Sequence, residues 1–234
     1  MIRIENLYKR FGRLQVLEGV NFQIEEQGVV AVLGPNGSGK TTILKTILGM
    51  VLPQEGEIYF DNQPVLNNWD YRNRIGYMPQ IARFPDNLTV RELIEMIKNI
   101  RDVDANEHAL IERFGLESSM DKKLGQLSGG TKQKVNIVLT FMFDSPLLIL
   151  DEPTAGLDPV SLIRLKALIQ EEKEKGKTFL ITTHIMSLVE ELSDQIVFLL
   201  EGQIFFQGSV QELKDQTGQK NLEHSIAKIL ESDA

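Results

Sequence analysis

Hydrophobic and polar positions follow a strand-like pattern over the first third of the chain. Three apolar stretches lie within residues 2–33, in IRIENL, LQVLEGVNFQI and VVAVLG, and each is typical of a β-strand. The third is a short continuous apolar run that ends in glycine, which indicates a buried strand. We expect a helix to follow from Lys40 to Gly49. Further strands are predicted in EGEIYFDNQPV and RIGYMPQ.

The apolar period becomes helical after Pro79. The stretch LTVRELIEMIKNIRD begins with Thr89, and Glu92 follows three residues later, which is the pattern of a capping box. Four apolar residues of this stretch share one helical face: Leu93, Ile94, Ile97 and Ile100. Two more helices are predicted in NEHALIERFGL and GGTKQKVNIVLTFMF. Residues 81–145 therefore form a mostly helical insertion in the predicted fold.

Strand patterns return in the last third of the chain, in LLIL, TFLIT, QIVFLL and QIFFQG. Between the first two lies a helix that Asp158 can cap, that Pro159 can begin and that Gly176 can end. Strands that alternate with helices predict a parallel sheet of the α/β class. The tail stretch NLEHSIAKIL has one apolar face, which we interpret as a helix that packs on the protein's own core rather than on a partner.

Composition and charge narrow the class of protein. The 234 residues are 42% hydrophobic and 25% charged, which fits one large globular domain or a core with an inserted subdomain. The net charge of −8 disfavours general nucleic-acid binding, because phosphate neutralisation needs clustered Lys and Arg. The chain has no cysteine for disulfides or thiolate metal sites. Neither a signal peptide nor a membrane-spanning run of about 20 apolar residues is predicted.

The stretch GPNGSGKT lies between a predicted strand and a predicted helix and matches the phosphate-loop pattern G-x-x-x-x-G-K-[ST]. Its glycines allow backbone N–H groups to approach phosphates closely, and the helix N-terminus adds partial positive charge. We expect Lys40 to reach the β- and γ-phosphates and Thr41 to bind Mg²⁺. A plain glycine turn is the disfavoured alternative. The predicted phosphate-binding residues are Gly34, Pro35, Asn36, Gly37, Ser38, Gly39, Lys40, Thr41 and Thr42.

Candidate catalytic residues follow the ends of predicted strands. Asp151 and Glu152 end the buried run LLILDEP, and ligands of parallel sheets bind beyond such ends. Asp151 is therefore a candidate Mg²⁺ ligand, and Glu152 is a candidate to orient or deprotonate water. His184 follows TFLITT and can donate a hydrogen bond to the γ-phosphate. Gln80 ends another strand, and its amide oxygen is a weaker candidate for the metal's shell. Without the phosphate loop, solvated carboxylates and a structural histidine would be the better interpretation.

A second glycine loop, LSGGTKQK at residues 127–134, also presents a serine cap and two glycines at the start of a helix. This arrangement is typical of an anion site, yet the chain already carries one.

Phe11 precedes a glycine in a predicted turn and has two interpretations: it stacks on a base, or it belongs to the core.

Taken together, these motifs resemble the nucleotide-binding subunit of ATP-binding cassette (ABC) transporters, over about residues 2–210. GPNGSGKT is similar to the Walker A motif, LLILDE to Walker B, LSGGT to the signature and AGLD to the D-loop. Gln80 matches the Q-loop and His184 the switch histidine. The resemblance places Phe11 and Val16 beside adenine.

The resemblance also implies a fold. The family has a P-loop NTPase (RecA-like) α/β core, here residues 1–80 and 146–210. It carries an N-terminal antiparallel β subdomain and an inserted helical subdomain, here residues 81–145. A short helical tail would follow at 211–234.

In that family two subunits pack head to tail, and each ATP lies between the Walker A loop of one and the signature of the other. Ser128, Gly129, Gly130 and Asp158 would then contact ATP in trans. Thr131 departs from the glutamine usual at the fifth signature position. Lys132 and Lys134 are expected on an exposed helix face rather than on phosphate.

The implied function is an Mg²⁺-dependent ATPase that dimerises on ATP, with a second copy or a homologous subunit. It would power a separate membrane permease from the cytoplasmic face, and segment 80–92 would lie near that permease. The compact length and short tail resemble subunits of exporter-type permeases, including those of copper and nitrous-oxide-reductase maturation systems. Two alternatives are a soluble ABC ATPase of DNA repair or translation and a non-hydrolysing nucleotide-gated module. A GTPase is disfavoured because N-K-x-D is absent from the sequence.

Overall fold

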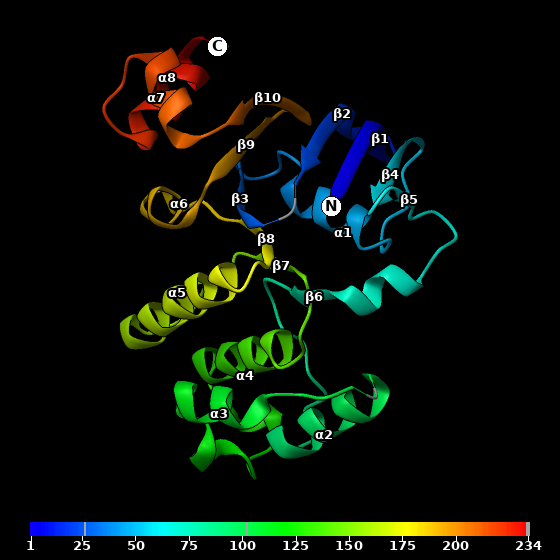
Figure 1. Cartoon of the computed structure of the whole chain (residues 1–234), viewed down its shortest axis with the longest axis vertical. Coiled ribbons are helices and arrows are strands. Elements are labelled where there is room, and N and C mark those ends of the chain that lie inside the picture. The colour runs from blue at the N-terminus through cyan, green and yellow to red at the C-terminus, as the bar shows by residue number, and fades with distance from the viewer. Residues whose placement is uncertain (26, 102, 233–234) are drawn as a thin grey trace. The chain divides into compact units, whose positions relative to one another are not determined.

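The computed structural model describes residues 1–25, 27–101 and 103–232. The chain forms two compact units, one of residues 1–72 with 178–234 and one of residues 73–177 (Figure 1). The second unit contains the predicted helical insertion and extends beyond it at both ends. The predicted boundaries of that insertion, 81 and 145, stay a prediction.

The first unit contains an antiparallel sheet built from the N-terminal strands. Its order is β2-β1-β4-β5. In β1, Ile2, Ile4 and Leu7 are buried while their neighbours are more exposed, as expected for a strand with one face on the core. The antiparallel β subdomain is thereby confirmed. The strands are β1 (Ile2–Phe11), β2 (Leu14–Ile24), β4 (Glu55–Phe60) and β5 (Gln63–Pro64).

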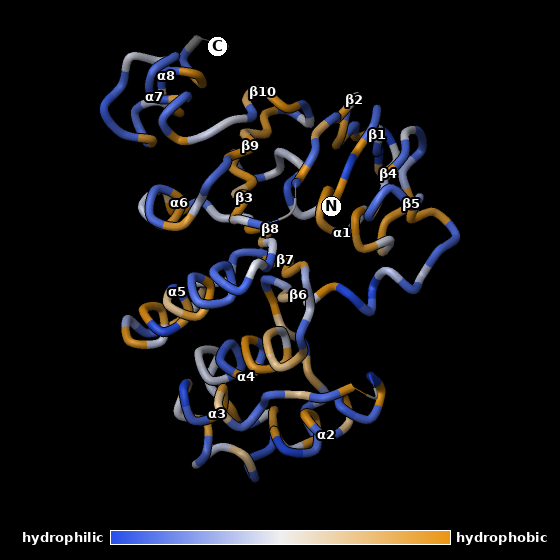
Figure 2. Tube along the Cα trace, in the orientation of Figure 1, coloured by the Kyte–Doolittle hydropathy of each residue, from blue (hydrophilic) through white to orange (hydrophobic). Residues whose placement is uncertain are grey.

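The first unit also contains a set of buried strands around β3. Strand β3 pairs in parallel with β8 and with β9, and β10 pairs antiparallel with β9. Strands β3 and β8 are buried along almost their whole length, which explains their continuous apolar sequences (Figure 2). The strands are β3 (Gly28–Leu33), β8 (Thr178–Thr182), β9 (Gln195–Leu200) and β10 (Gln203–Gly208).

Four helices are described in the first unit. Helix α7 begins with a capping box in which Ser209 and Glu212 exchange hydrogen bonds. Leu222 and Ile226 of α8 are buried in a cluster with Phe198, so the tail helix packs on the protein's own core as predicted. The helices are α1 (Lys40–Ile47), α6 (Met186–Leu192), α7 (Val210–Thr217) and α8 (Leu222–Ser232).

The second unit combines two parallel strands with four α-helices. Strand β6 pairs with β7 so that Ile75 lies opposite Leu147 and Met78 opposite Leu150. The elements are β6 (Ile75–Met78), α2 (Val90–Arg101), α3 (Glu107–Phe114), α4 (Gly129–Phe141), β7 (Leu147–Asp151) and α5 (Pro159–Glu174). Short 3₁₀ turns occur at Asp70–Arg74, Glu117–Ser119 and Leu124–Gln126.

The predicted helix caps are present in the second unit. Thr89 donates its backbone N–H to Glu92 Oε2 at 2.8 Å, and Glu92 returns a backbone hydrogen bond to Thr89 Oγ1 at 3.2 Å. Asp158 Oδ1 accepts from the backbone N–H of Ser161 at 2.9 Å at the start of α5. Both helices therefore begin where their sequences predict.

Lys177, at the C-terminal end of the second unit, forms ion pairs with two carboxylate groups. Lys177 Nζ lies 2.5 Å from Glu172 Oε2 and 2.9 Å from Asp144 Oδ1. Lys177 and Glu172 are each 9% exposed. Burial opposes ionisation of Glu172, but hydrogen bonds from Lys175 and Lys177 outweigh it and lower the pKa of the carboxyl group. Glu172 is therefore a buried charge that depends on its lysine partners.

Lys177→Met is expected to lower the free energy of unfolding by about 3 kcal/mol, because it removes one partner of a buried ion pair. Asp144→Asn is the matched control, since the Asp144 side chain is 95% exposed. Loss of the Asp144 charge is expected to change the free energy of unfolding by less than about 1 kcal/mol. Urea unfolding at pH 7 measures both. The Glu172 contribution is present above the carboxyl's unfolded pKa and should fade as pH falls through its lowered folded pKa. Equal stability of Lys177→Met and wild type at pH 7 would contradict this account.

None of the helices among the described residues is both long and apolar enough to cross a membrane.

Candidate functional site

The predicted phosphate loop joins β3 to α1 within the first unit. Gly34, Gly37 and Gly39 have φ values of 151°, 83° and 106°, where L side chains are strained. A Cβ atom on Gly34 would overlap the carbonyl oxygen of Leu199, and one on Gly39 would lie 2.9 Å from Val16 O. The loop thus needs glycine at both ends, for its backbone angles and for its close contact with neighbouring backbone.

Two polar side chains of this loop fit a bound anion. Lys40 opens α1 and is 8% exposed, and its Nζ donates to Gly34 O at 2.8 Å and Pro35 O at 3.0 Å. The ammonium therefore lies against the loop. Ser38 Oγ is buried with no hydrogen-bond partner among the described residues, so it needs a ligand to satisfy it. Thr41 and Thr42 occupy the first turn of α1 and are half-buried.

Three further predicted residues lie in the first unit. Phe11 ends β1 and is 51% exposed, so its ring is accessible for stacking rather than part of the core. The Lys9 ammonium lies 4.9 Å from the centre of that ring. Val16 lies in β2, and its carbonyl oxygen contacts the phosphate loop at Gly39. His184 is exposed, between the end of β8 and the start of α6.

The two predicted acidic residues end a buried strand of the second unit. Asp151 is the last residue of β7 and is 2% exposed, and Glu152 is 8% exposed. Glu152 has a φ of 49°, a left-handed conformation that is unfavourable for a residue with a side chain and is concentrated at functional sites. Burial raises the pKa of Tyr77 to about 12, and the negative charge of Asp151 adds to that rise. Asp151 is therefore close to Tyr77 on the neighbouring strand.

The structure brings Gln80 to the same strand edge as Asp151 and Glu152. Strands β6 and β7 run parallel, and Gln80 follows the end of β6 as an exposed residue. Asn136 Nδ2 donates to Pro79 O at 3.0 Å, which fixes the backbone next to Gln80. Gln80, which has an amide oxygen, and the two carboxylate residues Asp151 and Glu152 thus lie at the same edge of this strand pair. Oxygen groups of these kinds are ligands that Mg²⁺ accepts.

The second glycine loop forms the start of α4. Ser128 is its N-cap and accepts from the backbone N–H of Thr131 at 3.2 Å. The hydroxyl groups of Ser128 and Thr131 also lie 2.9 Å apart. Gly129 and Gly130 are the first helical residues, where backbone N–H groups lack intrahelical partners. Thr131 therefore supplies the backbone N–H that the Ser128 cap accepts, and its hydroxyl group adds a second contact to Ser128.

Both lysines of this loop are less exposed than predicted, and the Lys132 side chain is 30% exposed. Lys134 was expected on an exposed helix face, but its Nζ lies 2.9 Å from Asp158 Oδ2, and its side chain is only 23% exposed. The hydrogen bonds from Lys134 and then from Ser161 hold the pKa of Asp158 well below its usual range. The partner is 24 residues away in sequence, so helical periodicity alone could not reveal it.

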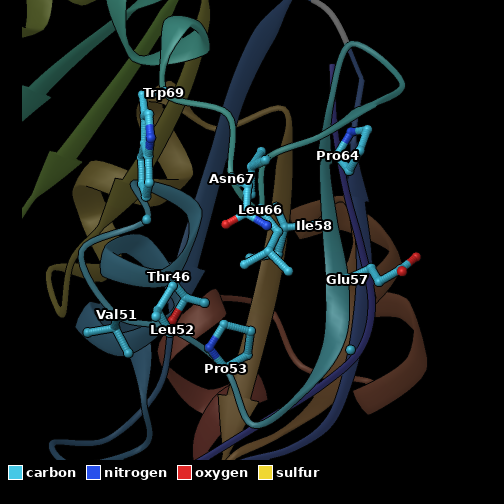
Figure 3. A pocket seen from close by; sticks show the side chains of 13 residues that line it. Thr46, Val51, Leu52, Pro53, Glu57, Ile58, Pro64, Leu66, Asn67 and Trp69 are labelled. Atoms are coloured by element: carbon cyan, nitrogen blue, oxygen red, sulfur yellow. The ribbon is translucent and has the colours of Figure 1, made fainter.

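A pocket of about 530 Å³ lies in the first unit, away from the predicted site residues (Figure 3). It is formed by the last turn of α1 and the loop after it, by residues 56–58 in the first half of β4, and by residues between 64 and 69, from the end of β5 onward. Trp69 stands at this pocket, is 55% exposed, and has the Arg72 guanidinium 4.6 Å from its ring centre. Leu52 and Leu66 also line the pocket and are largely exposed. Sequence reasoning gave no signal for this hollow.

A glycine loop between a buried parallel strand and a helix, together with an acidic strand end, defines the class of P-loop nucleoside triphosphatases. The family model described as ABC transporter matches residues 17–155. The chain belongs to the ABC transporter family as an ATP-binding subunit. Curated relatives named as transport and export ATP-binding proteins favour this interpretation over the soluble DNA-repair or translation ATPase considered from the sequence.

A curated relative has a similar length. The chain is 34% identical over 226 residues to the lantibiotic transport ATP-binding protein SrtF of Streptococcus pyogenes, and the match covers 95% of this chain and 94% of the relative.

Solved structures share the whole fold. An ATP-binding subunit of an ABC transporter superposes with a TM-score of 0.92 at 29% identity, over 98% of this chain and 99% of that one. The ATP-binding cassette MJ0796, in a dimeric post-hydrolysis state bound to ADP and Pi, superposes with a TM-score of 0.80 at 27% identity, over 89% and 98% of the two chains. Fold class and ATPase activity are thereby confirmed.

Proposed function

We propose that two copies of this subunit, or one copy and a homologous subunit, pack head to tail around two ATP molecules and drive a separate membrane permease. The observation that carries this proposal is the second anion loop. Ser128 and Gly129 are exposed at the N-terminus of α4, in a chain whose phosphate loop already serves one nucleotide. A dimeric relative among the solved cassettes supports the pairing.

Binding of ATP is assigned first to the first unit. Backbone N–H groups of the loop at residues 34–39, with the helix N-terminus of α1, surround the phosphates. Ser38 Oγ gains the partner it lacks among the described residues, and Lys40 turns from the loop carbonyls to the β- and γ-phosphates. Phe11 stacks on adenine with Val16 beside it.

Thr41, Gln80 and Asp151 would hold Mg²⁺, since they offer hydroxyl, amide and carboxylate oxygens. When bound, Mg²⁺ neutralises charge on the β- and γ-phosphate oxygens. The carboxylate of Asp151 is suited to this because the end of β7 holds it in place.

Hydrolysis is assigned to Glu152 and His184. Glu152 orients a water and accepts its proton as the water oxygen attacks the γ-phosphorus and the bond to the bridging oxygen breaks, releasing ADP. His184 donates a hydrogen bond to the γ-phosphate. Ser128, Gly129 and Gly130, with Asp158, complete the site from the partner chain. Loss of the bridging γ-phosphate then lets the pair open.

The permease is proposed to be an integral membrane protein that contacts segment 80–92, with this subunit on the cytoplasmic face. Export is the proposed direction, supported by relatives named as a lantibiotic transport ATP-binding protein and a Nod factor export ATP-binding protein. The narrower prediction of a copper or nitrous-oxide-reductase maturation role remains a prediction. The net charge of −8 fits a protein partner better than a nucleic-acid partner, because phosphate neutralisation needs clustered Lys and Arg.

Glu152→Gln protein is expected to form a stable dimer with Mg-ATP, because ATP still binds but its γ-phosphate is not removed. Gel filtration with light scattering, in ATP and in ADP, measures the change. Glu201→Gln is the control, since Glu201 is an exposed residue of another turn. A Glu152→Gln protein that binds ATP and stays monomeric would contradict the head-to-tail model.

A further inference from the structure

Helix α4 holds the loop that carries Glu152 and Asp158. Gln133 Nε2 donates to Pro153 O at 3.2 Å in a buried contact, and Lys134 pairs with Asp158 at 2.9 Å. A Cβ atom added to Gly130 would lie 3.0 Å from Gly156 O, so the helix backbone also approaches this loop closely. Positions 130, 133 and 134 share one helical face. One side of the first turns of α4 therefore contacts the loop at Pro153, Gly156 and Asp158.

The same helix holds the backbone before Gln80. Asn136 Nδ2 donates to Pro79 O at 3.0 Å, one helical turn after Gln133. Gln133 and Asn136 are 5% and 3% exposed, so both hydrogen bonds are shielded from water. Hydrogen bonds in such surroundings are stronger and constrain geometry more than exposed ones. Helix α4 thereby connects the two chain segments that carry Gln80 and Glu152.

The loop after Glu152 needs such support. Glu152 is held at a φ of 49°, and a backbone in this region persists only where its surroundings fix it. Hydrogen bonds within the loop include Ala155 N–H to Glu152 O and Leu157 N–H to Thr154 O, both at 3.2 Å. From outside the loop, Gln133 contacts Pro153 and Lys134 contacts Asp158.

The signature loop lies at the N-terminal end of α4. Ser128 caps α4, so the residues proposed to contact the partner's ATP begin the same helix that holds the Glu152 loop. A helix transmits displacement along its axis as a hydrogen-bonded unit. In the head-to-tail dimer, one end of α4 would thus face one ATP, while its side contacts the loop that serves the other.

We propose that Gln133 and Lys134 are positioning residues that couple the signature loop to the placement of Glu152, so that the two ATP sites of the dimer hydrolyse cooperatively. The inference rests on the head-to-tail dimer proposed above. Neither residue touches the reacting atoms. Lys134 acts through Asp158, and Gln133 acts through the carbonyl group of Pro153.

Lys134→Met and Gln133→Met test the coupling in the full chain. Both keep most of the side-chain volume and remove the polar contact. We expect kcat to fall about 10-fold or more, because small displacements of a catalytic group have effects of this size. The Hill coefficient for ATP should fall from near two toward one, while monomer affinity for mant-ATP without Mg²⁺ changes less than about twofold.

Lys134→Arg should restore the Asp158 ion pair and at least half of the lost kcat. Lys132→Met is the matched control on the same helix, because Lys132 has only a 3.9 Å contact with Asp86, and it should behave as wild type. Thermal unfolding of each variant separates a coupling defect from a folding defect. A variant that unfolds more than about 5 °C lower is replaced by its leucine counterpart (Lys134→Leu or Gln133→Leu), which also removes the polar contact.

Wild-type kcat and Hill coefficient in both methionine variants would overturn the inference, as would a Hill coefficient of one in the wild type. The head-to-tail model is tested separately, in the Glu152→Gln background. If Glu152→Gln protein fails to dimerise with ATP, the proposed function itself is wrong. If it dimerises and Lys134→Met still hydrolyses cooperatively, only the coupling role is wrong.

Discussion

Ser128→Arg protein is expected to bind ATP as a monomer with nearly wild-type affinity and to lose ATPase activity by on the order of 1000-fold. Ser128 is exposed at the tip of the second glycine loop, in a different compact unit from the phosphate loop. A bulky guanidinium there would prevent the partner's γ-phosphate from reaching Gly129 and Gly130. Removing even one donor to a reacting group typically lowers the rate 10²–10³-fold.

Two measurements separate this outcome from trivial failure. Fluorescence titration with mant-ATP reports binding by the monomer, and steady-state phosphate release reports turnover. Ser118→Arg places the same charge on an exposed serine of this unit and should hydrolyse as wild type. Ser128 also caps α4, so a loss of about 1 kcal/mol in stability is expected in any substitution of it. Loss of monomer binding together with turnover would show that the signature serves its own chain's ATP.

The second large effect is expected from Gly34→Ala, which should abolish ATP binding and lower the free energy of unfolding by about 3 kcal/mol. The added Cβ atom would overlap the carbonyl oxygen of Leu199 on β9, and both groups belong to backbone that cannot rotate away. Overpacking of this kind costs about 1–3 kcal/mol, and the strained φ of 151° adds to it.

Gly37→Ala is the matched comparison within the same loop. Its φ of 83° is also strained for alanine, but no atom lies within 4 Å of the added Cβ among the described residues. We expect a loss of about 1–2 kcal/mol, from backbone strain alone. Chemical denaturation measures both variants, and equilibrium dialysis with ATP measures binding. If the two variants lose equal stability, contact with Leu199 does not explain the requirement for glycine at position 34.

Much of the fold could be predicted because local signals and tertiary structure agree. The caps of α2 and α5 are encoded by residues three positions apart, and the buried strands by continuous apolar runs. Helix α6 was not predicted. It has seven residues and starts at Met186 without a side-chain cap, so neither length nor capping gives a signal.

The candidate site was predictable in its residue types but not in its supports. The phosphate loop is a local motif whose context can be read from the chain. The contacts of Gln133 and Lys134 join residues 20 or more positions apart, and their polar side chains look like an ordinary helix surface in sequence. Pairings of this kind depend on how α4 packs, which periodicity does not specify.

The left-handed backbone at Glu152 has an evolutionary consequence. Most positions with such a φ can be relaxed by glycine, which gains stability without altering the surface. At Glu152 that substitution would delete the carboxylate that the strand end presents. Selection for stability would therefore favour glycine at position 152, whereas selection for activity keeps glutamate. Thermostable members of such a family would have to gain stability at other positions.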